Sequence, residues 1–128
     1  MRTALLAAAA LCLVGSACRN SAEPTQHVVV LNVDKIDVPA SVSSTSALDV
    51  VLSVMTNPCQ TFTGIDADRT SVSVKLTALG KDPEKGCTDL AMVQSRSYRI
   101  EPPFPPGTFE IIVDRGSMSR LIATVQVQ

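Results

Sequence analysis

The chain is 128 residues long, which is enough for one small domain. It contains 11 Lys and Arg residues against 12 Asp and Glu residues, so it lacks the basic excess of a nucleic-acid-binding protein. With three Phe, one Tyr and no Trp, it also lacks the aromatic platform on which bases or sugars stack.

The first 17 residues have the organisation of a secretory signal peptide. Arg2 supplies a positive charge, an apolar run follows at residues 4–14, and residues 15–17 are small, as at a cleavage site. The apolar run is too short to cross the roughly 30 Å of a bilayer core as a helix. With Cys18 directly after the small residues, the segment resembles a bacterial lipoprotein signal. This resemblance implies cleavage before Cys18 and acylation of that cysteine.

A lipoprotein signal predicts an extracytoplasmic protein that is anchored through Cys18 to the cell membrane or to the outer membrane. Gly15 departs from the family pattern, which prefers Leu three residues before the cysteine. The small residues also suit ordinary signal peptidase, and the alternative product is a soluble secreted or periplasmic protein. Residues 18–26 are polar and contain Pro24, so we expect a flexible tether ahead of one domain over residues 27–128.

The cysteines that follow the signal indicate one disulfide. Cys12 lies within the segment that would be removed, which leaves Cys18, Cys59 and Cys87. An odd number of cysteines in an oxidising compartment leaves one thiol over, and acylation of Cys18 would account for it. We therefore expect a Cys59–Cys87 disulfide. The chain has no Cys-x-x-Cys spacing, so zinc and redox sites are not indicated.

Alternating apolar and polar residues divide the first part of the domain into short strands. The clearest alternation is in residues 71–78, where Val72 and every second residue after it point to one side, as in a half-buried antiparallel strand. An exposed, charged loop is expected at residues 80–86. The strands expected in this part cover residues 27–33, 48–55, 61–65 and 71–78.

The second part of the domain is predicted to end in a β-hairpin over residues 108–127, with its turn at Gly116. Two short strands are expected before it, at residues 88–93 and 98–101. Four prolines within residues 102–106 exclude a central strand and favour an extended connector.

This proline-rich connector contains a candidate docking loop, Pro103, Phe104 and Pro105. A proline-rich segment loses little conformational freedom on binding, and Phe104 would offer an aromatic side chain to an envelope partner. The alternative is that Phe104 folds back and covers the open end of the domain.

About seven short strands and no convincing helix predict an all-β fold, an immunoglobulin-like antiparallel β-sandwich, with a small β-barrel as the alternative. The order of several motifs is similar to that in small bacterial extracytoplasmic proteins with an immunoglobulin-like domain. The similarity covers residues 50–127 and implies this fold, but it implies no activity. Its motifs are Pro58-Cys59, Arg69-Thr70 before an alternating strand, Cys87, and Pro106-Gly107-Thr108-Phe109 at the start of the hairpin.

Residues that could carry out chemistry lack the partners that such chemistry requires. His27 is the only histidine, and the chain has no Gly-x-Ser-x-Gly motif to supply a nucleophile. Asp66 and Asp68 do not have the spacing of a calcium-binding loop. We therefore expect a protein that is not an enzyme, without a metal, a cofactor, a small-molecule substrate or a nucleic-acid partner.

Together these features favour a membrane-anchored, non-catalytic lipoprotein that acts as a binding or structural module of the cell envelope. Its expected partners are the lipid membrane, through Cys18, and another envelope protein. The alternative is a periplasmic or surface inhibitor of a hydrolase such as a protease or lysozyme, by analogy with small lipoproteins of this size.

Overall fold

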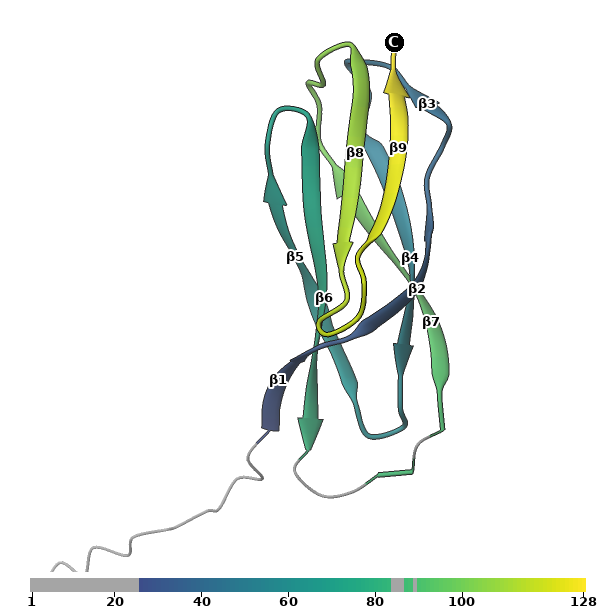
Figure 1. Cartoon of the computed structure of the whole chain (residues 1–128), viewed down its shortest axis with the longest axis vertical. Coiled ribbons are helices and arrows are strands. Elements are labelled where there is room, and N and C mark those ends of the chain that lie inside the picture. Colours follow the sequence, from purple (N-terminus) through teal and green to yellow (C-terminus); the bar gives the residue numbers. More distant parts are fainter. Residues whose placement is uncertain (1–25, 84–86, 89) are drawn as a thin grey trace, which may run out of the picture.

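A computed structural model describes residues 26–83, 87, 88 and 90–128. These residues contain nine β-strands and no helix, and the strands form a two-layer sandwich (Figure 1). The predicted all-β sandwich is therefore confirmed, with nine strands in place of about seven, and it is not a closed barrel. The strands are β1 (Gln26–Val30), β2 (Asn32–Asp37), β3 (Ser41–Val42), β4 (Leu48–Thr56), β5 (Thr61–Arg69), β6 (Ser73–Pro83), β7 (Met92–Ile100), β8 (Gly107–Asp114) and β9 (Leu121–Val127).

The larger layer, sheet A, has the strand order β5-β6-β8-β9-β3, and β1 pairs with the C-terminal part of β6 beyond the end of β8. The smaller layer, sheet B, has the order β2-β4-β7 and is antiparallel throughout. Sheet A is mixed, because β6–β8 and β3–β9 are parallel pairs. The expectation of a purely antiparallel sandwich is therefore wrong for sheet A, since periodicity indicates which face is buried and not which strands are neighbours.

The first strands pass from one sheet to the other and back again. The single strand expected at residues 27–33 is wrong, because β1 belongs to sheet A and β2 to sheet B. Leu31 marks the crossing: its side chain is buried, and its amide donates a hydrogen bond to the carbonyl of Ala78 at 2.8 Å. A segment that crosses the core is apolar throughout, and its sequence therefore looks like that of a single strand buried on both faces.

The predicted alternation of β4 and of the C-terminal hairpin is confirmed, because their inward residues form the centre of the core. In β6 the inward row is Val74, Leu76 and Ala78, whereas Val72 lies before the strand and is 55% exposed. The fully buried side chains include Leu48, Val50, Leu52 and Val54 from β4, Phe109, Ile111 and Val113 from β8, and Val125 from β9.

Two further expectations are corrected by long-range pairing. Residues 80–83 are not part of an exposed loop, because β6 continues to Pro83 where it pairs with β1. The two short strands expected at 88–93 and 98–101 are one strand, β7, which pairs with β4 along its whole length. In both cases a partner strand from elsewhere in the chain supplies the hydrogen bonds that the local sequence does not predict.

Gly80 is buried where β1, β5 and β6 meet, and we predict that Gly80→Ala destabilises the domain by about 1–3 kcal/mol. A Cβ atom there would lie 2.9 Å from both methyl carbons of Leu31 and 2.9 Å from the backbone oxygen of Thr61. The backbone oxygen cannot retreat without disturbing the β5–β6 pair. Urea unfolding measures the change. Gly64→Ala in β5 is the matched control, because its Cβ would meet no atom within 4 Å; equal midpoints for the two variants would contradict the prediction.

Candidate functional site

The predicted disulfide is confirmed: Cys59 and Cys87 are joined, with their Cα atoms 5.9 Å apart. It ties the β4–β5 turn to the segment that follows β6. The Asn57 side chain shapes this turn, because its Oδ1 accepts hydrogen bonds from the amides of Cys59 at 3.0 Å and Gln60 at 2.9 Å. The disulfide is thus a structural element. Cys18, the predicted signal peptide and the tether up to residue 25 lie outside the described residues.

The candidate docking loop does not offer Phe104 to a partner. The ring is 2% exposed and lies edge-to-face on Phe109, with 5.0 Å between the ring centroids. The ring is therefore not exposed as the docking hypothesis expects, and Phe104 covers the end of the sandwich, as the alternative expects. Its flanking residues Pro103 and Pro105 remain exposed.

Arg69, at the end of β5, holds this connector in place. Its guanidinium donates hydrogen bonds to the backbone oxygens of Pro103, at 2.8 Å, and of Glu101. The same group lies 4.9 Å from the ring centroid of Phe104, which is a cation–π distance. A side chain distant in sequence therefore helps to hold the proline-rich segment against the sandwich.

The other candidate residues are dispersed over the surface. His27 lies exposed on β1, and Asp66 and Asp68 lie exposed on β5. Among the residues that the structure describes, no three His, Cys, Asp or Glu side chains are grouped so that they could hold a metal ion. Within the same residues, no helix has the length and apolar character needed to span a membrane.

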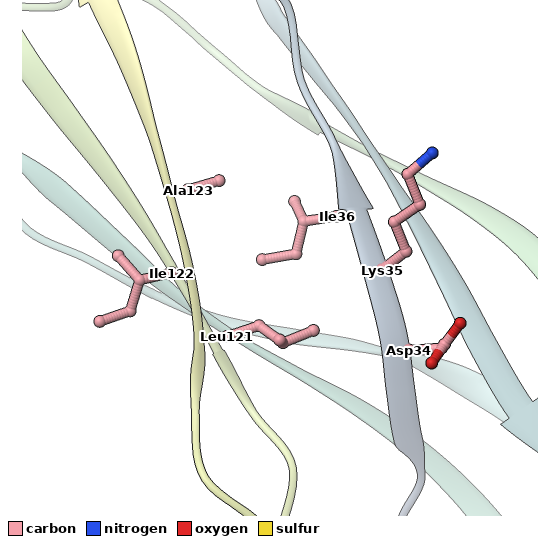
Figure 2. A pocket seen from close by; sticks show the side chains of 6 residues that line it. All are labelled: Asp34, Lys35, Ile36, Leu121, Ile122 and Ala123. Carbon is pink, nitrogen blue, oxygen red and sulfur yellow. The ribbon is translucent and has the colours of Figure 1, made fainter.

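A groove of about 230 Å³ lies where β2 of sheet B faces β9 of sheet A, on one open side of the sandwich (Figure 2). In Figure 2 the side chains of Ile36, Leu121 and Ala123 point into the space between the two strands, and Ile122 points away from it. The groove is lined by Asp34, Lys35, Ile36, Leu121, Ile122 and Ala123.

Backbone groups of β9 face this groove without a partner strand. β8 pairs with one edge of β9 over its full length, whereas β3 pairs with the other edge only at Gln126 and Val127. The Gln126 amide donates to the carbonyl of Ala40 at 3.0 Å, across that second edge. Because backbone groups alternate in direction along a strand, the amides of Ile122 and Thr124 point to the same edge. Within the described part of the chain, no strand pairs with them there.

Beside the groove, β2 carries two carboxylates and one ammonium, from Asp34, Asp37 and Lys35. Asp34 and Lys35 lie on the side of β2 away from Ile36 in Figure 2. The Lys35 ammonium lies 3.0 Å from the Asp37 carboxylate, and both side chains are largely exposed. The walls between the two strands are therefore apolar, and the polar groups available inside the groove are those of the strand edges. This arrangement suits hydrogen bonding to another backbone and the uptake of apolar side chains.

The opposite open side of the sandwich, between β5 and β7, is covered by arginine side chains. The Arg96 guanidinium of β7 lies 4.5 Å from the ring centroid of Phe62 on β5. Arg69 spans the same side nearer the proline-rich connector. The two open sides thus differ, since long side chains bridge one and leave the β2–β9 groove accessible.

Comparison of the chain with protein-family models, with curated proteins and with solved structures found no match. Sequence reasoning did not identify the groove, because its walls come from strands far apart in the chain. One local signal was present: Ala123 is the small member of the inward row of β9, between Leu121 and Val125.

Proposed function

We propose that this protein is a non-catalytic binding module of the cell envelope, anchored to a membrane by a lipid on Cys18. We further propose that it binds an extended polypeptide segment of another envelope protein along the β2–β9 groove. The observation that carries the binding proposal is the free edge of β9 beside apolar walls.

A free strand edge selects its ligand by geometry. A row of amides and carbonyls with the spacing of a β-strand is best matched by another extended backbone, as in β-strand addition. Every second side chain of such a segment would point inward, towards Ile36, Leu121 and Ala123. The free edge ends at Gln126, where β3 begins to pair. The bound segment would therefore be short, with about four residues in contact.

Two features support the envelope location. The pattern ahead of Cys18 resembles a lipoprotein signal, and the Cys59–Cys87 disulfide suits an oxidising compartment. β1 begins at Gln26, eight residues after Cys18, so a lipid on that cysteine would keep the domain close to the bilayer.

We predict that Thr124→Pro weakens strand addition and leaves the fold intact. Proline removes the one amide of residue 124, which points to the groove, while the β8–β9 ladder uses the amides of the residues on either side of it. Extended peptides selected from a random display library against the full chain should bind Thr124→Pro roughly tenfold more weakly, as expected for one lost hydrogen bond. Calorimetric titration measures the affinity.

Thr124→Val is the matched control, because it changes the same side chain and keeps the amide. In the complex, amide hydrogen exchange should slow at Ile122 and Thr124. Selected peptides that bind Thr124→Pro as tightly as the unaltered chain, or that protect amides elsewhere only, would show that the groove is not the binding site.

A further inference from the structure

Large apolar side chains that remain exposed are concentrated at one end of the sandwich. Of the eight in the described residues, six surround the end at which β1 begins, the lower end in Figure 1. We call these six the basal collar: Val28, Val30, Leu90, Met92, Val93 and Met118. Exposed large apolar side chains that gather at one end of a molecule mark an interaction surface more often than side chains that are scattered singly.

On sheet A, the basal collar is formed by β1 and the turn between β8 and β9. Val28 and Val30 point to the outer face, because Val29 between them packs against the core. Val28 is 69% exposed, and its neighbour across the strand pair is Lys81. Met118 belongs to the β8–β9 turn, which lies against Val30.

On sheet B, the basal collar is formed by the start of β7 and the residues before it. Met92 and Val93 pair with the last residues of β4, Thr56 and Met55. Leu90 precedes the strand and is 65% exposed. The basal collar therefore includes residues of both layers around the disulfide-linked end, rather than one edge of one sheet.

The opposite end of the sandwich has a different surface. Its proline-rich connector buries Phe104, and the segment beside it contains Ser43, Ser44 and Thr45. Val72, in the β5–β6 turn, is the exposed large apolar residue at that end among the described residues. The polarity of the molecule thus changes along its long axis.

The chain that precedes the described residues enters the domain at the basal collar. β1 starts at Gln26, and Cys18 is eight residues earlier, a span of at most about 28 Å when extended. A lipid on Cys18 would therefore hold this end, and not the proline-rich end, against the bilayer. Lys81 beside Val28 adds a cation at this end of the molecule, and its stem can lie along apolar surface.

We infer that the basal collar is a membrane-contacting surface whose apolar side chains enter the headgroup–acyl boundary of the bilayer that holds the anchor. The inference rests on the proposed lipid at Cys18 and is independent of the groove. A single acyl chain binds a membrane only marginally, and a second contact makes attachment stable. The basal collar would supply that second contact and would orient the sandwich with its proline-rich end away from the membrane.

The absence of tryptophan from the chain allows a direct test. Val28→Trp and Val72→Trp place one fluorophore at each end of the sandwich, both at exposed positions. The full chains, purified from bacterial membranes, are reconstituted into phosphatidylcholine–phosphatidylglycerol vesicles with or without bromine on the acyl chains. Bromine should quench Val28→Trp fluorescence roughly twofold and leave Val72→Trp unchanged, as expected for burial of the former at the acyl boundary.

Leu90→Trp provides a second position on the other sheet, so a folding defect in one variant does not decide the result. Flotation of the same vesicles reports the anchor separately, with Cys18→Ser as its control. Flotation without quenching at Val28 and Leu90, or with equal quenching at Val72, overturns the basal collar and leaves the anchor standing. Failure of the unaltered chain to float overturns the anchor and the membrane-contacting surface together, whereas flotation of Cys18→Ser overturns the anchor alone.

Discussion

Replacing Phe104 with alanine is expected to lower the free energy of unfolding by about 3–5 kcal/mol. The ring packs against Phe109 at the end of the core that the proline-rich connector covers, and its removal leaves a cavity between β8 and the connector. The Arg69 guanidinium also loses the aromatic face over which it lies at 4.9 Å. The loss of unfolding free energy should therefore exceed the value expected from the lost buried area alone.

The Phe104→Ala prediction is measured by equilibrium unfolding in urea, with Pro105→Ala as the control at the exposed neighbouring position. The control should stay within about 0.5 kcal/mol of the unaltered chain, as surface substitutions usually do. Unchanged stability of Phe104→Ala, combined with loss of a binding partner, would restore the hypothesis that this loop is a docking element.

The second large effect is expected at the disulfide. Replacing both Cys59 and Cys87 with serine should destabilise the domain by about 3.5 kcal/mol, because the bond closes a loop between two residues that are 28 positions apart in the sequence. The bond also ties Cys87, which lies between β6 and β7, to the β4–β5 turn. A loss of this size is a large share of the stability of a small domain.

Reductant provides the internal comparison for the disulfide. The unaltered chain in reductant should unfold at the same urea concentration as the double serine variant, and reductant should have no effect on that variant. A midpoint for the unaltered chain that does not move when the bond is reduced would show that the remaining contacts already restrain the loop.

The sequence predicts the strands that have one buried face and one exposed face. β4, β8 and β9 alternate regularly because their inward residues meet the core and their outward residues meet solvent or the sheet surface. The crossing at Leu31 could not be predicted in this way, since an apolar run indicates burial without indicating the sheet to which each part belongs. The parallel pairing of β6 with β8 could not be predicted either, because the local sequence does not encode the register between distant segments.

The candidate sites show the same division. The cysteine count predicts the Cys59–Cys87 bond, because few pairings are possible. The burial of Phe104 could not be decided from the sequence alone, because Arg69, which contacts the connector, lies in β5 and reaches it only in the folded chain. The groove depends on β2 and β9 lying side by side, and the gap at Ala123 has meaning only once that arrangement is known.

The passage of the first strands between the two sheets also has a kinetic consequence. β1 pairs with β6, β2 with β4 and β3 with β9, so none of the three has a partner earlier in the chain. A chain that emerges N-terminus first must keep β1 unpaired until β6 has followed, and β3 until β9 has followed. Such non-local topology folds slowly, in milliseconds to seconds. Sheet A is therefore complete only when its last strand, β9, is available to pair with β8 and β3.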